Sequence, residues 1–103
     1  MNNIGRIQKW YASQGDGDWE HTYGVNVETL DNPGWSVDIE LHHTKFAGVV
    51  FAPVEYGVGP DSHPSDPNWL VCKVVDRVFS GRGGPDKLDE IFGVFCNWAE
   101  KNS

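Results

Sequence analysis

The chain has 103 residues, of which 39% are hydrophobic and 22% charged, a composition that excludes a disordered chain and is typical of one soluble domain. We therefore predict a single domain spanning residues 1–103. Fifteen acidic and eight basic residues give a formal net charge of -7. Binding to phosphate backbones needs clustered Lys and Arg, so this balance argues against a nucleic-acid partner. Negative charge favours a basic protein partner, or simply keeps the domain soluble.

Cysteine content and hydropathy point to a cytoplasmic protein. Cys72 and Cys96 form no CxxC motif and no disulfide framework, which predicts buried free thiols. The N-terminus lacks the continuous apolar stretch of a signal peptide. No run approaches the ~20 apolar residues that a membrane span requires. We expect no membrane association.

The first half of the chain predicts a helix followed by a β-hairpin. Apolar side chains recur at helical spacing within residues 3–13, and Gly15 and Gly17 end that helix. Residues 23–29 and 35–41 alternate apolar with polar side chains. Between these runs, Asp31-Asn32-Pro33-Gly34 is a turn signal in which Gly34 accepts a positive φ. The pattern predicts an antiparallel hairpin with one apolar and one acidic face.

The second half predicts three more strands, a long loop and a helix. The third strand is expected within residues 46–56, interrupted at Pro53, and residues 57–68 form the loop. Strands at 69–75 and 78–80 are joined by a tight turn at Asp76-Arg77. Pro85 suits the first position of a helix that runs to Ala99. The fold class is α+β: a sheet of about five antiparallel strands, with an N-terminal and a C-terminal helix packed on one face.

For three candidate metal or phosphate sites, the sequence favours a structural role of the same residues. Asp16, Asp18 and Glu20 lack the glycine and the glutamate that a calcium loop needs at fixed positions. His42 and His43 are adjacent in a predicted strand and would point to opposite faces, so they cannot readily share a metal. The glycine-rich run 80–85 lacks the Lys-Ser/Thr ending of a P-loop, and a turn with left-handed backbone angles explains its glycines. We expect no metal and no cofactor.

The strongest candidate for function is the segment Asp16-Gly17-Asp18-Trp19-Glu20-His21. It sets a large aromatic side chain among carboxylates, a composition that suits recognition of a basic partner. The alternative is a helix-to-strand connection whose carboxylates accept hydrogen bonds from local backbone N–H groups. No nucleophile with a base and an orienting group accompanies the segment, so the sequence does not predict an enzyme.

These residues carry a resemblance to a known family. The strings Asp16-Gly17-Asp18-Trp19-Glu20-His21 and Glu28-Thr29-Leu30-Asp31-Asn32-Pro33-Gly34-Trp35 resemble the immunity protein 53 family of bacterial polymorphic toxin systems. Trp69, Cys72, Gly83-Gly84-Pro85, Phe95 and Trp98 extend the resemblance, which runs from about Ile7 to Ala99. The loop 57–68 is the least typical part. The resemblance implies a cytoplasmic antitoxin that binds and blocks a toxin encoded beside it; a basic nuclease would suit the charge.

We therefore expect partner contacts from two neighbouring motifs, from the acidic hairpin face and from the long loop. The candidates are Asp16, Asp18, Trp19, Glu20, His21, Asp31, Asn32, Trp35, Asp38, Glu40, Asp61, His63 and Asp66. Trp10, Trp35 and Trp98 also fall on apolar stripes, which favours the core for them. Two alternatives stay open: a small enzyme or ligand-binding domain that uses the Asp16–His21 cluster, and a homodimer paired through a sheet edge. The chain is expected to be a monomer or a homodimer.

Overall fold

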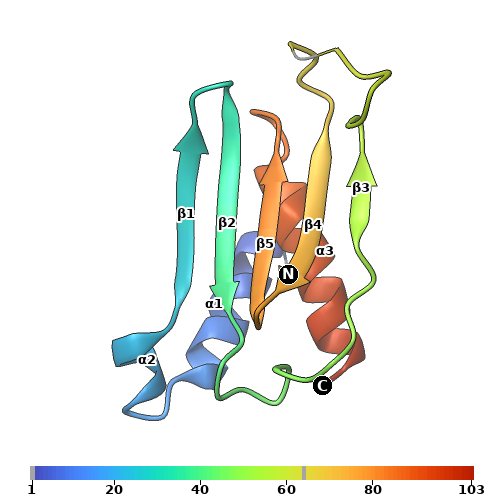
Figure 1. Cartoon of the computed structure of the whole chain (residues 1–103). Helices are drawn as coiled ribbons and strands as arrows, with labels where there is room; N and C mark the ends of the chain where they lie inside the picture. Colours follow the sequence, from blue (N-terminus) through green and yellow to red (C-terminus); the bar gives the residue numbers. More distant parts are fainter. Residues whose placement is uncertain (1, 64) are drawn as a thin grey trace.

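A computed structural model describes residues 2–63 and 65–103. Met1 lies outside the described residues, and so does Pro64, which belongs to the predicted loop. The sheet has five antiparallel strands in the order β1-β2-β5-β4-β3; α1 and α3 lie behind it on one face, and the short α2 lies beyond the lower end of β1 (Figure 1). The elements are α1 (Asn3–Gln14), α2 (Trp19–Thr22), β1 (Val25–Leu30), β2 (Gly34–Glu40), β3 (Val54–Tyr56), β4 (Leu70–Val75), β5 (Val78–Gly83) and α3 (Leu88–Lys101). The predicted α+β class is confirmed.

The core lies between the sheet and the helices α1 and α3. Paired positions such as Ile39 and Phe79 face the same side of the sheet and are fully buried. Trp10 of α1 and Phe95 of α3 meet edge to face, with ring centroids 4.9 Å apart. At the surface, Arg6 of α1 donates to the Glu100 carboxylate at 2.8 Å and so ties the two helices together.

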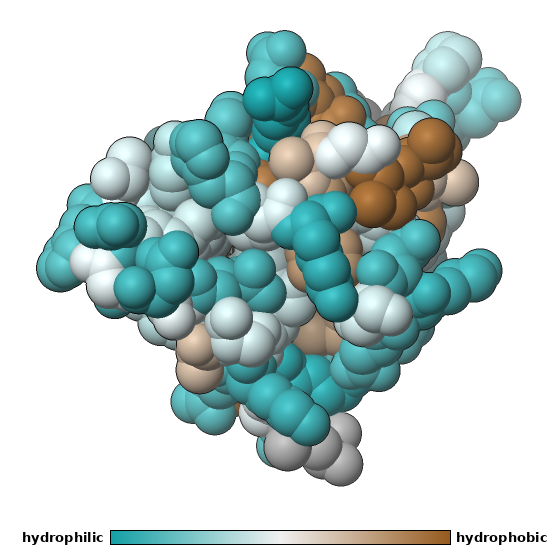
Figure 2. Space-filling view, turned by 90° about the horizontal axis from the view of Figure 1, so that it is seen from below, coloured by the Kyte–Doolittle hydropathy of each residue, from teal (hydrophilic) through white to brown (hydrophobic). Residues whose placement is uncertain are grey.

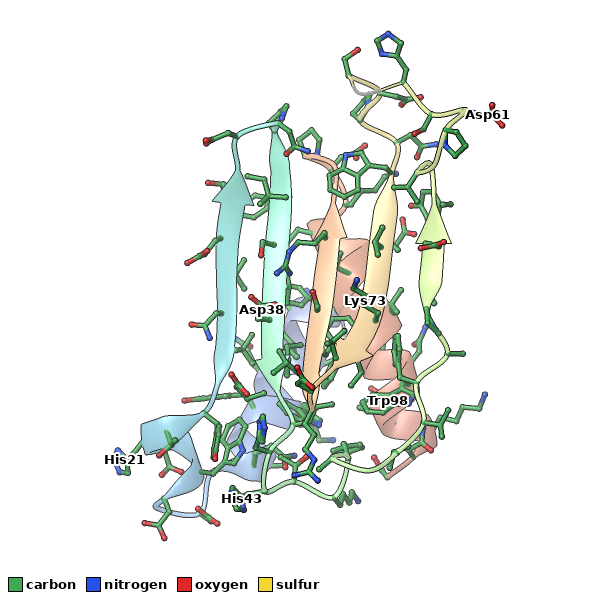
Figure 3. The ribbon with its side chains drawn as sticks, in the orientation of Figure 1. His21, Asp38, His43, Asp61, Lys73 and Trp98 are labelled. Carbon is green, nitrogen blue, oxygen red and sulfur yellow. The ribbon has the colours of Figure 1, made fainter. Side chains whose placement is uncertain are left out.

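On the other face of the sheet, no helix is formed by the residues that the structure describes. Side chains at alternate positions of the strands point to this open face, among them Asp38 and Lys73, which Figure 3 labels. Arg82 on β5 forms an ion pair with Asp38 on β2 at 3.1 Å. The predicted acidic face of the hairpin is therefore the open face, and the predicted apolar face of β2 is the buried one.

Two predicted strands have different bounds in the structure. The third strand is only Val54–Tyr56; the residues before it form turns and an irregular segment. Phe46 in that segment is only 2% exposed because its ring packs against Trp10 and Trp98. The fifth strand runs to Gly83 instead of ending at 80, since its glycines continue the pairing with β2 and β4.

Glycine has a different role in this chain from the predicted one. Gly34, Gly81, Gly83 and Gly84 do not have positive φ angles. A Cβ at Gly34 would collide with the carbonyl oxygen of Gly83, and a Cβ at Gly81 with Ile91 of α3. These glycines permit close approach of backbone and helix, so the expected left-handed angles were wrong. The β4–β5 turn is as predicted, with positive φ at Asp76 and Arg77.

The last helix begins at Leu88, three residues after the predicted start at Pro85. Pro85 lies in a turn, and its carbonyl oxygen accepts a hydrogen bond from the Trp35 indole N–H at 2.9 Å. His42 and His43 lie in a turn after β2, not in a strand as predicted, and His43 has a φ of 60°. The short helix α2 was not predicted.

Candidate functional site

The carboxylates of Asp16 and Glu20 hold the turn that leads into α2. Asp16 Oδ1 accepts the backbone N–H groups of Asp18 and Trp19, both at 2.9 Å. Glu20 accepts the N–H groups of Asp16 and Gly17, whose φ of 100° only glycine adopts easily. The N–H groups of Trp19 and Asp18 hold the pKa of the Asp16 carboxyl below its usual value. Backbone N–H groups, its own first, likewise lower the pKa of Glu20.

Trp19 belongs to the core. Its side chain is only 4% exposed, and its indole N–H donates to the carbonyl oxygen of His42 at 2.9 Å. Its ring meets Trp10 edge to face, with centroids 6.0 Å apart. The expectation that Trp19 offers a direct contact to a partner conflicts with this burial; the side chain instead anchors α2 to the body of the protein.

Asp18 and His21 are the members of the segment that are exposed and whose side chains have no hydrogen-bond partner among the described residues. In Figure 3, His21 points away from the body of the protein at the lower left. Figure 2 views this end from below, and the left side, where α2 lies, is mostly hydrophilic. This end of the molecule thus presents polar groups on a segment fixed from beneath by Trp19.

The second motif lies at the opposite end of the molecule. Asp31 and Asn32 are exposed at the turn between β1 and β2, whereas α2 precedes the other end of β1 (Figure 1). Strand β1 runs between His21 and Asp31, so the contact candidates of the two motifs are not neighbours, contrary to the prediction. Trp35 is half-buried beside the turn and is fixed by its hydrogen bond to Pro85.

The loop candidates share the end of the molecule that carries the β1–β2 turn. Asp61, labelled in Figure 3, and His63 and Asp66 are all exposed. Part of their bonding is local: Asp66 accepts the N–H of Asn68 at 2.9 Å, and the His63 ring lies 2.7 Å from the Ser65 hydroxyl. On the open face of the sheet, Asp38 and Glu40 are half-exposed and pair with Arg82 and His42, respectively. The thirteen candidates are thus spread over two ends and one face.

A groove between α1 and the edge strand β1 was not predicted. It has a volume of about 570 Å³ and brings apolar side chains of both elements to the surface. Its lining is Ile4, Ile7, Gln8 and Tyr11 of α1, Phe92 of α3, Glu40 of β2, and residues 21–27. The sequence marked several of these side chains as apolar stripes, but both stripes were expected to be buried. Only the tertiary arrangement shows that they leave a groove between them.

The two cysteine thiols are buried and are not activated as nucleophiles. Burial raises the pKa of the Cys72 thiol to about 12 and also raises that of Cys96, so neither is disposed to form a thiolate. Within residues 2–63 and 65–103, no three His, Cys, Asp or Glu side chains gather in a group that could hold a metal ion. Over the same residues, no helix is both long and apolar enough to cross a membrane.

Comparison with known proteins identifies a family. Neither a curated protein nor a solved structure matches the chain significantly. The sequence model described as Immunity protein 53 matches residues 4–100, a span that includes all five strands, α2, every candidate residue, and α1 and α3 except for one terminal residue of each. The chain therefore belongs to the Immunity protein 53 family.

Proposed function

We propose that this immunity protein binds a cognate bacterial polymorphic toxin one to one and neutralises it by covering its active site or an essential surface. The family match over residues 4–100 is the observation that carries the proposal. A protein that must silence a lethal partner needs nanomolar affinity or better, about -12 kcal/mol of binding free energy. A small rigid fold that presents polar groups on anchored segments is suited to that task.

The proposed contact residues are the candidates other than the two tryptophans. They are Asp16, Asp18, Glu20, His21, Asp31, Asn32, Asp38, Glu40, Asp61, His63 and Asp66. Glu20, Asp38 and Glu40 are half-exposed and the rest are exposed. Because these residues span two ends of the molecule, one toxin surface need not cover them all. The side of α2 and β1 is favoured, since His21 and Glu40 also line the groove between α1 and β1. Trp19 and Trp35 act as supports that fix the segments carrying the contacts.

We infer that the toxin is basic, and a nuclease is the toxin class that charge favours. The supporting observation is the net charge of -7, with acidic side chains at both ends of the molecule and on the open face of the sheet. Opposite charges on two partners speed their encounter and suppress wrong pairings. The site of action in this proposal is the cytoplasm.

Co-expression with the toxin encoded beside it tests the proposal. We expect the immunity protein to restore growth and to co-purify with the toxin in a one-to-one complex. An unrelated toxin expressed from the same vector is the control, and its toxicity should be unaffected. Rescue without any complex would contradict binding and point instead to an enzyme that acts on the toxin's product or target. Absence of rescue would contradict the antitoxin proposal altogether.

A further inference from the structure

Strand β1 is a free sheet edge, and its register shows which backbone groups it leaves unpaired. The N–H of Glu40 donates to the carbonyl oxygen of Gly24 at 3.1 Å, while Val25 lies opposite Ile39. Because hydrogen-bonded and non-hydrogen-bonded pairs alternate in an antiparallel ladder, Asn26 and Glu28 bond to β2. Val25, Val27 and Thr29 therefore direct their N–H and C=O groups away from the sheet.

Apart from the charge of Glu28, this edge lacks the features that usually protect an edge strand. It is six residues long and contains no Pro or Lys. It pairs with β2 on one side, and no described strand lies on its other side. The opposite edge, β3, has three residues and directly follows Pro53. Its Tyr56 hydroxyl also donates to the Glu90 carboxylate of α3 at 2.7 Å. Of the two edge strands in the described part of the chain, only β1 is long and open enough to accept another strand.

The groove next to this edge is apolar on its helix side. Ile4 and Tyr11 of α1 are 46% and 42% exposed, and Val27 of β1 is 41% exposed. All three line the groove of about 570 Å³. A strand added beside β1 would place every second side chain over this groove, where it would cover these apolar groups.

The remaining side chains of an added strand would lie on the open face of the sheet. There β1 presents Asn26 and Glu28, and beside them β2 presents Asp38, whose carboxylate also pairs with Arg82 at 3.1 Å. Basic side chains on the added strand would complement this row. A second copy of the chain suits it poorly, because each copy has a net charge of -7 and would set its own Glu28 near this face.

We propose that an extended segment of the toxin, with apolar residues alternating with Lys or Arg, pairs with β1 and fills the α1–β1 groove. This inference rests on the proposed function and specifies the surface that carries it. Backbone hydrogen bonds to Val25, Val27 and Thr29 would hold the segment, and the alternating side chains would select it.

Amide hydrogen exchange, measured by NMR on the free protein and on its complex with an inactivated form of the neighbouring toxin, tests the pairing. In the free protein the amides of Val25, Val27 and Thr29 should exchange quickly, while those of Asn26 and Glu28, bonded to β2, should be protected. In the complex the first three should slow at least about tenfold. A stable complex in which they still exchange quickly would overturn the edge proposal and leave toxin binding intact.

A pair of matched variants gives a second readout. Val27→Lys and Val54→Lys each add one charge to an edge-strand valine that faces the helix side, and the two valines are 41% and 38% exposed. We expect V27K to weaken toxin binding about 100-fold and V54K to change it less than about threefold. Equal effects of the two changes would overturn the proposal. Circular dichroism and thermal melting establish that both variants are folded.

Two further outcomes separate this inference from the proposed function. If the wild-type protein forms no complex with the toxin, the proposed function fails and the edge proposal fails with it. If the three amides are already protected in the free protein, and light scattering gives the mass of a dimer, a second copy occupies the edge. That result would overturn pairing with the toxin without affecting the antitoxin proposal.

Discussion

Trp19 shows how a single side chain can look like a contact residue in the sequence and yet belong to the core. Truncating its buried ring leaves a cavity beside Trp10 and frees the His42 carbonyl. We expect Trp19→Ala to lower the free energy of unfolding by roughly 3–5 kcal/mol. His21→Ala, in the same short helix but exposed, should change it by no more than about 0.5 kcal/mol. Urea denaturation measures both; equal stabilities would contradict the burial of Trp19.

The neighbouring carboxylates Asp16 and Asp18 differ in the same way. Asp16 accepts two backbone N–H groups, whereas Asp18, the residue before α2, makes no capping hydrogen bond. Asp16→Ala should therefore lower the midpoint of thermal unfolding at pH 7, and Asp18→Ala should leave it nearly unchanged.

The effect of Asp16 on stability should depend on pH. The pKa of Asp16 in the folded protein lies below the ordinary value of an aspartate because the N–H groups of Trp19 and Asp18 stabilise the carboxylate. A lowered pKa means that the stabilisation is fully present above the ordinary value and is lost as pH falls through the lowered one. The midpoints of wild type and Asp16→Ala should converge on acidification. A constant difference down to low pH would contradict the assigned hydrogen bonds.

At the scale of elements, the contact between β5 and α3 depends on a missing side chain. A Cβ at Gly81 would collide with Ile91 and lie 3.2 Å from the Phe79 ring. Gly81→Ala should therefore lower the free energy of unfolding by roughly 1–3 kcal/mol. Gly48→Ala, whose Cβ would meet nothing within 4 Å, is the matched control and should have little effect. Combining Gly81→Ala with Ile91→Ala should cost less than the sum of the two; additive costs would place the strain elsewhere.

How well the sequence predicted an element depended on whether local pattern or tertiary contact determines it. The helix at 3–13 and the hairpin strands were predicted to within about two residues, because their apolar side chains recur at the period of a helix or a strand. In α1 and β2 this periodicity is also the burial pattern, whereas in the edge strand β1 Val27 stays exposed. The predicted end of strand β5, at residue 80, was too early because glycine usually marks a turn. The close approach of α3, which leaves no room for a Cβ, explains why Gly81 lies within the strand. The segment before β3 was read as a strand from Phe46 and Val49–Phe51, yet Phe46 fills a space between Trp10 and Trp98.

The candidate site was predictable in its residue types and not in its layout. The sequence could identify the acidic segment 16–21 and the turn 31–34, but the strand between them places them at opposite ends. The alternative role considered for Asp16 and Glu20, bonding to local backbone, is present in the structure. The groove beside β1 needed the packing of α1 against the sheet, which no local pattern encodes.

At the scale of the whole molecule, charge should govern the rate of association with a basic toxin. Exposed charges are screened over a distance of about 8 Å at physiological ionic strength. We expect the association rate constant to fall about tenfold or more between low salt and 0.5 M salt, with a smaller change in the dissociation rate. Replacing exposed acids such as Glu28 and Asp18 with Lys should flatten this dependence. An association rate constant that changes neither with salt nor with these substitutions would contradict the charge argument.

The most direct test of the account is to titrate purified toxin with this immunity protein and to measure the remaining toxin activity. One-to-one binding with nanomolar affinity or better predicts a linear fall that reaches zero at one equivalent. The mixture at that point should have the mass of one copy of each protein by light scattering. Toxin activity that persists in excess immunity protein would contradict direct neutralisation, and so would an activity lost without any complex.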